Sequence, residues 1–354
     1  MLKNLSHIIV LVVVLLPQAS AMADSATTAD SAAAAFDYTV LPFDELLRLA
    51  NAGDTQAMFY VGCEYGTGYG IEKNYAEAVK WFRKAAAQGD ADSQYNLGIC
   101  YVNGKGVQQD YSEAVKWYRK AAEQGNANAQ YGLGVCYDNG EGVPQDRTEA
   151  IKWYCKAAEQ GVVNAQFNLG NCYYEGDGVA RNFIEAAKWW RKAAEQGDAK
   201  SQYSIGLCYD IGAGVQKSPV EAAKWWQKAA EQGDIMAQNN LGICYANGEG
   251  VQQNKAEAVK WYRKAAEQGN FDAEHNLGCC YYYGDGVSRD YSEAVKWFQK
   301  AADQGVGESQ YMLGVCYYNG RGVPKDTAEA KRLHKLAAEQ GITSAEQCLQ
   351  ILNH

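Results

Sequence analysis

Residues 90–125 read DADSQYNLGICYVNGKGVQQDYSEAVKWYRKAAEQG, and close variants of this stretch repeat along most of the 354-residue chain. A cysteine followed by a tyrosine marks the period at Cys100, Cys136, Cys172, Cys208, Cys244, Cys280 and Cys316. The eight copies occupy 54–89, 90–125, 126–161, 162–197, 198–233, 234–269, 270–305 and 306–341. A fixed period of this length is typical of a solenoid, in which each unit buries its apolar face against its neighbours.

Each copy contains two helical patterns joined by a glycine-containing turn. Asp90 is a suitable helix N-cap and apolar residues follow it at helical spacing, so we expect a first helix over 91–103. Gly104 and Gly106 end this pattern and predict a turn. Because this Gly-x-Gly pair follows a helix rather than a strand, we interpret it as a turn and not as a phosphate-binding loop.

A capping box marks the start of the second helix. Asp110 is followed three residues later by Glu113, which predicts that each side chain accepts a hydrogen bond from the backbone N–H of the other residue. Gly125 predicts a left-handed end to this helix. The equivalent pairs are Asn74 and Glu77, Asp146 and Glu149, Asn182 and Glu185, Ser218 and Glu221, Asn254 and Glu257, Asp290 and Glu293, and Asp326 and Glu329.

A glycine stands in the middle of every first helix, as Gly98 does in the copy at 90–125. A helical glycine costs about 1 kcal/mol relative to alanine, so a compensating contact is expected. We expect the two helices of a repeat to approach closely at this point, with the small Ala121 and Ala122 facing Gly98 and with Trp117 supplying bulk elsewhere.

These patterns predict an all-α fold, a right-handed α-solenoid superhelix of about eight helix-turn-helix repeats. An N-terminal half repeat is expected at 36–53 and a C-terminal capping helix at 342–354. The last full repeat has Leu333 and His334 where each of the other repeats has a tryptophan followed by a second aromatic residue. This departure fits a capping unit, whose outer face meets water.

The first 23 residues have the pattern of a secretory signal peptide. Lys3 precedes an apolar run over 8–16, and small residues follow up to Ala23. The apolar run of nine residues is shorter than the about 20 needed to span a bilayer. We therefore expect an exported protein, periplasmic or secreted, with a flexible leader at 24–35 and no stable membrane insertion after cleavage. An uncleaved membrane anchor is the alternative.

The charge of the chain disfavours some classes of partner. The formal net charge is −9, and removal of Lys3 with the signal peptide would make it −10. Lysines are spread along the repeats rather than clustered. Nucleic acid and anionic lipid are therefore not expected as the main partner.

The repeat resembles that of the Sel-one-like repeat family, a branch of the tetratricopeptide-like helical repeats. The residues that carry the resemblance are Leu97, Gly98, Tyr101, Gly104, Gly106, Val107, Glu113, Ala114, Trp117, Tyr118, Lys120, Ala121 and Ala122. The resemblance covers 54–341 and implies a scaffold or adaptor for proteins or peptides, with the first helices lining the concave side of the array.

Eleven cysteines in an exported protein would suggest disulfides. Stacked helix pairs lie about 8–10 Å apart, however, whereas a disulfide needs Cα atoms within about 4.4–6.8 Å. We therefore predict that the repeated cysteines are small buried hydrophobic residues. A cysteine-rich branch of the resembled family joins the two helices of each unit by a disulfide, but second helices here contain only Cys155, which is predicted to face solvent.

Candidate chemistry in the sequence is sparse. His275, Cys279 and Cys280 come nearest to a metal or nucleophile cluster, because positions four apart share a helix face. A zinc site needs three or four ligands, and no other histidine lies nearby in the sequence. We predict no catalytic residue, no metal and no cofactor.

An enzyme is the alternative to a scaffold. The resemblance to the cysteine-rich branch implies beta-lactam binding or weak beta-lactamase activity. A serine mechanism would need Ser-x-x-Lys with a later Lys-Thr-Gly, and neither occurs in the chain. We therefore favour a scaffold without chemistry of its own.

Variable positions on the first helices are the candidate binding surface, because positions that are constant among the repeats hold the fold. The candidates are Asp92, Tyr95, Asn96, Asn128, Tyr131, Asn164, Phe167, Asn168, Tyr203, Asn240, His275, Asn276 and Tyr311. Aromatic rings beside asparagine amides can hold an extended peptide. The alternative is that the aromatic row belongs partly to the core between units.

Overall fold

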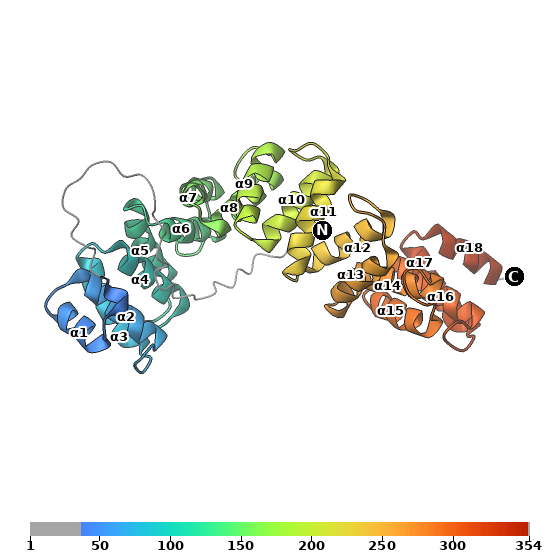
Figure 1. Cartoon of the computed structure of the whole chain (residues 1–354), viewed down its shortest axis with the longest axis horizontal. Helices are drawn as coiled ribbons and strands as arrows, with labels where there is room; N and C mark the ends of the chain where they lie inside the picture. The colour runs from blue at the N-terminus through green and yellow to red at the C-terminus, as the bar shows by residue number, and fades with distance from the viewer. Residues whose placement is uncertain (1–36, 353–354) are drawn as a thin grey trace. The chain divides into compact units, whose positions relative to one another are not determined.

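The computed structural model describes residues 37–352, so the predicted signal peptide and leader lie outside the described residues. Over 37–352 the regular structure is helical, with a short 3₁₀ helix η1 (Tyr38–Val40) and eighteen α-helices (Figure 1). The α-helices are α1 (Phe43–Asn51), α2 (Thr55–Thr67), α3 (Tyr75–Ala87), α4 (Ala91–Asn103), α5 (Tyr111–Glu123), α6 (Ala127–Asn139), α7 (Arg147–Glu159), α8 (Val163–Glu175), α9 (Phe183–Glu195), α10 (Ala199–Ile211), α11 (Pro219–Glu231), α12 (Ile235–Asn247), α13 (Lys255–Glu267), α14 (Phe271–Tyr283), α15 (Tyr291–Asp303), α16 (Gly307–Asn319), α17 (Thr327–Glu339) and α18 (Thr343–Leu352).

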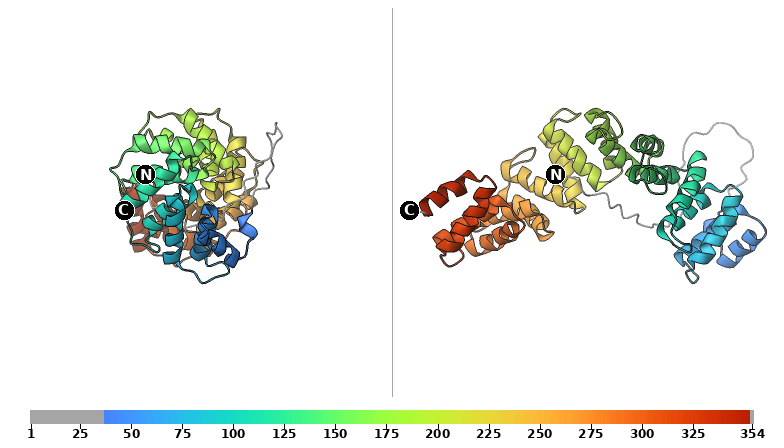
Figure 2. Two further views of the ribbon diagram at one scale, coloured as in Figure 1. Left: turned by 90° about the vertical axis from the view of Figure 1, so that its left-hand side faces the viewer. Right: turned by 180° about the vertical axis from the view of Figure 1, so that it is seen from behind.

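The helices form two-helix repeats, as the sequence predicts. The even-numbered helices α2 to α16 are the first helices of the eight repeats, and the odd-numbered helices α3 to α17 are the second helices. Within each unit the two helices of a repeat pack together, as α4 and α5 do, and a second helix packs on the first helix of the next repeat, as α5 does on α6 and α9 does on α10 (Figure 2). The all-α solenoid is confirmed, and the hand of the superhelix stays a prediction.

The described chain divides into two compact units. The N-terminal unit contains residues 37–172 and 176–180, and the C-terminal unit contains 173–175 and 181–352. Between residues 37 and 352, no helix is both long and apolar enough to cross a bilayer.

The second helices begin at the predicted caps, but the capping box is only half formed. The Asp110 carboxylate accepts a hydrogen bond from the Glu113 backbone N–H at 3.0 Å, and the cap side chain does the same in all eight repeats. The prediction that the Glu113 side chain accepts a hydrogen bond from the Asp110 backbone N–H is wrong. The Asp110 N–H donates instead to the carbonyl of Tyr101 at 3.0 Å, and the Glu113 carboxylate pairs with Lys116 at 2.8 Å. The first helix therefore supplies the acceptor for the cap.

In seven of the eight repeats the glycine in the middle of the first helix faces the ring of an aromatic residue or histidine. A Cβ placed on Gly98 would lie 2.4 Å from the ring of Tyr118 in α5. Close approach of the two helices is confirmed. The prediction that Ala121 and Ala122 face Gly98 is wrong, because the atoms nearest to the Gly98 position belong to Tyr118. The missing side chain leaves room for an aromatic ring, and His334 fills the same position against Gly314 in the last repeat.

The repeated cysteines lie on the packed side of the first helices. Cys136, Cys208 and Cys316 are at most 3% exposed. Burial raises the pKa of the Cys136 thiol to about 12. Across residues 37–352 none of the cysteines forms a disulfide. Cys155 is half-buried, so the prediction that it faces solvent is wrong.

Replacing Ser201 by alanine should raise the free energy of unfolding by about 1 kcal/mol. The Ser201 hydroxyl is buried and has no hydrogen-bond partner among residues 37–352, and a buried unsatisfied hydroxyl is destabilising. Alanine occupies the equivalent position in the flanking repeats, at Ala165 and Ala237. Urea unfolding followed by circular dichroism measures the change. Ser309→Ala is the matched control and should destabilise, because the Ser309 hydroxyl bonds His275 at 2.8 Å.

Candidate functional site

The candidate binding residues lie on the first helices of both units, on a surface that we call the first-helix face. Asp92 and Asn164 are exposed. The half-buried candidates are Tyr95, Asn96, Asn128, Tyr131, Phe167, Asn168, Tyr203, Asn240, His275, Asn276 and Tyr311. The face therefore presents amides and ring edges rather than whole aromatic side chains.

The aromatic row rests on the second helix of its own repeat. Ring centroids of Tyr131 and Tyr154 lie 5.9 Å apart, and those of His275 and Phe298 lie 5.8 Å apart. Burial raises the pKa of Tyr131 to about 12. The row is thus an edge of the core as well as a surface. These ring contacts lie within a repeat, whereas the alternative placed the row partly in the core between units.

The amide row links successive repeats. Asn168 acts on the hydroxyl of Tyr131 in the preceding repeat and lowers the pKa of that hydroxyl against the larger effect of burial, and Asn240 does the same to Tyr203. The amide nitrogen of Asn276 donates to Asn239 at 3.1 Å. An asparagine side chain offers two donor hydrogens and an oxygen with two lone pairs, so each amide keeps bonding capacity for a ligand. Sequence reasoning identified Asn168, Asn240 and Asn276 without showing which groups they meet.

His275 joins a thiol and a hydroxyl in the C-terminal unit. Its Nε2 lies 3.4 Å from the sulfur of Cys279, and its Nδ1 lies 2.8 Å from the Ser309 hydroxyl. Burial raises the pKa of Cys279 to about 12 and lowers the pKa of His275. Both groups are therefore neutral at pH 7, and a protonated thiol is a weak nucleophile. No set of three potential metal ligands gathers anywhere in residues 37–352.

A shallow polar pocket of about 350 Å³ lies beside this cluster. It is lined by residues of α12, α13 and α14, including Asn247, Tyr262, Asn276 and Cys279. The pocket is lined by one predicted candidate, Asn276, and by Asn247, which is not among the predicted candidates. A larger groove of about 470 Å³ lies over Trp117 of the second helix α5, in the N-terminal unit.

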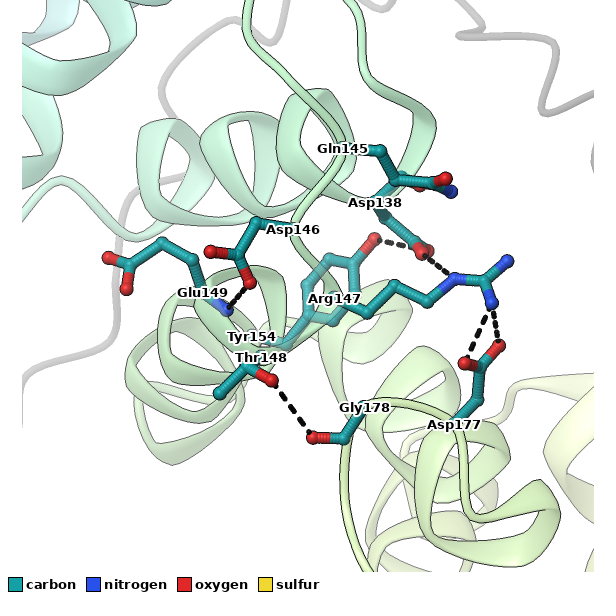
Figure 3. Close-up of polar contacts among 9 residues, drawn as sticks. All are labelled: Asp138, Gln145, Asp146, Arg147, Thr148, Glu149, Tyr154, Asp177 and Gly178. Atoms are coloured by element: carbon teal, nitrogen blue, oxygen red, sulfur yellow. Dashed lines mark hydrogen bonds and ion pairs between the residues drawn. The ribbon is translucent and has the colours of Figure 1, made fainter.

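Arg147 forms a polar junction that sequence reasoning missed (Figure 3). Its guanidinium lies 2.6 Å from the Asp177 carboxylate and 3.5 Å from that of Asp138. The Tyr154 hydroxyl donates to Asp138 at 3.2 Å. Complementary residues 30 positions apart were the available signal, and Lys255 with Asp285 repeats it at 2.7 Å. Because the side chains of Arg147, Asp138 and Asp177 are partly exposed, their ion pairs contribute little free energy and serve mainly to position the turn.

Comparison with known proteins gives the same division into repeats. The Sel1 repeat matches residues 55–90, 91–126, 127–162, 163–198, 199–234, 235–270, 271–306 and 307–342. The chain belongs to the Sel1 repeat family. Sel1 repeats generally mediate binding between proteins. No curated protein matches this Sel1 chain.

Two solved structures resemble this Sel1 array. One is a protective antigen present in uropathogenic Escherichia coli strains that displays an SLR fold, with 38% identity and a TM-score of 0.83. The similarity covers 87% of this chain and 66% of that protein, so the chain spans just under two thirds of it. The other is a Sel1 repeat protein from Oxalobacter formigenes, with 34% identity, a TM-score of 0.63, and coverage of 87% of this chain and 89% of that one.

Proposed function

We propose that this protein is an exported scaffold that binds a protein or peptide partner through its first-helix face, without chemistry of its own. The proposal is carried by a structural difference between the constant and the variable positions of the repeat. Positions constant among the repeats, such as the glycine and the aromatic residue that fills its space, are buried against each other. Variable positions keep amides and ring edges at the surface of the first helices.

Export is part of the proposal and is supported by the sequence pattern of residues 1–23. The similar Escherichia coli protein is a protective antigen, which also favours a location outside the cytoplasm. Expression of the full chain in a bacterium, followed by fractionation and intact-mass measurement, tests it. A mature protein beginning near Asp24 in the periplasm or medium is expected. A cytoplasmic protein that retains residues 1–23 would contradict export.

Two arginines introduced on the first-helix face should abolish partner capture. Asn128→Arg with Asn164→Arg alters the face in the N-terminal unit, where Asn164 is exposed and Asn128 is half-buried. Alanine variants of Tyr131 and Asn168 are less suitable, because both side chains are half-buried and the Tyr131 ring packs on Tyr154. Affinity capture from an extract of the source organism, quantified by mass spectrometry, should show at least about a tenfold loss, since buried like-charge and desolvation costs reach several kcal/mol.

The matched control places the same added charge elsewhere. Ala87→Arg with Gln108→Arg alters an exposed second-helix end and an exposed turn of the same unit. This control should capture partners as the natural protein does, with an equal helical circular dichroism signal in all three proteins. Equal capture by the first-helix variant and the natural protein would contradict the proposed function.

A further inference from the structure

The two layers of helices carry opposite net charge. The even-numbered helices α2 to α18 contain nine acidic residues and one basic residue, Lys200. The odd-numbered helices α3 to α17 contain 23 basic and 15 acidic residues. Each unit shows the same sign on its first helices, so the asymmetry is a property of both. A surface of one sign attracts partners of the other sign and repels its own.

Asp272 and Glu308 concentrate this charge in the C-terminal unit. They occupy the same position in successive repeats, on α14 and α16, and both are exposed. Across the described chain, neither carboxylate lies within 4.0 Å of a lysine or arginine nitrogen. Burial raises the pKa of Asp272, the neighbouring His275 lowers it, and the negative charge of Glu308 raises it. Within residues 37–352 this pair therefore has no lysine or arginine partner.

Asp92 occupies the equivalent position of the repeat in the N-terminal unit. Its carboxylate accepts a hydrogen bond from the neutral amide of Asn126 at 2.8 Å. Burial raises the pKa of Asp92, and the charge of Asp90 adds to this effect. Asp138 differs, because Arg147 already pairs with it. The unmatched negative charge thus lies at the Asp92 position in both units.

The spacing of the two carboxylates selects a conformation of the ligand. The His275 to Ser309 bond of 2.8 Å shows that α14 and α16 are in direct contact. Helices in contact have axes about 8–10 Å apart, so equivalent residues on them are separated by a similar distance. In an extended chain of polyproline II type, side chains three residues apart lie on the same side and about 9 Å apart.

We propose that the first-helix face binds an extended peptide in which two lysine or arginine side chains, three residues apart, engage Asp272 and Glu308. The amides beside them, such as Asn276, hydrogen-bond the peptide backbone. The net positive charge of the second helices repels such a peptide and confines it to the first-helix face. This inference rests on the proposed function and names the chemistry of its partner.

Selection from a random decapeptide library displayed on phage, against the full chain, provides the test. Enriched peptides should carry pairs of lysine or arginine three residues apart. Synthetic copies of these peptides should bind Asp272→Asn/Glu308→Gln about 3- to 20-fold more weakly in fluorescence anisotropy, as expected for two exposed ion pairs. Binding to the natural protein should weaken as salt is added.

Glu231→Gln/Glu267→Gln is the matched control, because it removes two acidic charges from exposed positions on second helices. It should change affinity less than twofold. Enrichment of neutral or acidic peptides whose binding is lost in Asn128→Arg/Asn164→Arg would overturn this inference and leave the proposed function standing. Failure to enrich any peptide, or enriched peptides insensitive to every first-helix variant, would overturn both.

Discussion

Replacing Gly106 by alanine should lower the free energy of unfolding by about 2–5 kcal/mol. Gly106 has a φ of +72°, a left-handed conformation that costs a residue with a Cβ about 1–2 kcal/mol. The added Cβ would also lie 2.2 Å from the backbone carbonyl oxygen of Tyr75, in the second helix of the preceding repeat. Backbone cannot rotate away as a side chain can, so overpacking adds about 1–3 kcal/mol.

Gly70→Ala separates the two causes. Gly70 is the equivalent residue of the first repeat and has the same φ of +72°, but an added Cβ there would meet no atom within 4 Å. It should cost only about 1–2 kcal/mol, the conformational part alone. Urea unfolding measures both variants, and hydrogen exchange should show faster opening of α3 and α4 in Gly106→Ala. Equal losses for the two variants would show that the contact between repeats contributes nothing.

Replacing Glu274 by glutamine should stabilise the protein by about 1–3 kcal/mol at pH 7. Glu274 is 3% exposed and stands where six other repeats have glutamine. In those repeats the amide nitrogen donates to a carbonyl eight residues earlier, as Gln310 does to Ala302 at 3.3 Å. An ionised carboxylate has no hydrogen to donate, although it still accepts a bond from Gln304 at 2.8 Å.

The gain from Glu274→Gln should depend on pH. Burial raises the pKa of Glu274 in the folded protein, and the charge of Lys300 and the Gln304 bond only partly oppose it. The unfolded carboxyl has a pKa of about 4.3. The folded state therefore binds this proton more tightly, and the associated stability is present below the unfolded pKa and is lost as pH rises through the folded pKa. The difference between variant and natural protein should shrink at pH 4 and grow toward pH 7.

Gln310→Glu is the reciprocal control, because it introduces the carboxylate into the next repeat. It should destabilise by a similar amount at pH 7 and by less at pH 4. Urea unfolding at both pH values measures the two variants. A pH-independent effect of Glu274→Gln would show that the carboxylate is not responsible.

Much of this protein can be predicted from residues alone. The period, the helix bounds in 90–125 and the cap residues were all predicted correctly, because helix propensity, capping and glycine turns act over a few neighbouring residues. The candidate amides on the first helices could also be found, because they differ among repeats while the core positions do not.

Tertiary structure alone decided which side chains meet. It placed the ring of Tyr118, rather than an alanine, against Gly98, and it brought His275 within 2.8 Å of the Ser309 hydroxyl in the next repeat. It also showed that Glu274 is buried, although a glutamate side chain differs from a glutamine side chain only in its terminal group. The repeat period fixes the position of each residue within its repeat. The contacts of a side chain depend on how helices that are distant in sequence stack on each other, and local sequence does not determine that stacking.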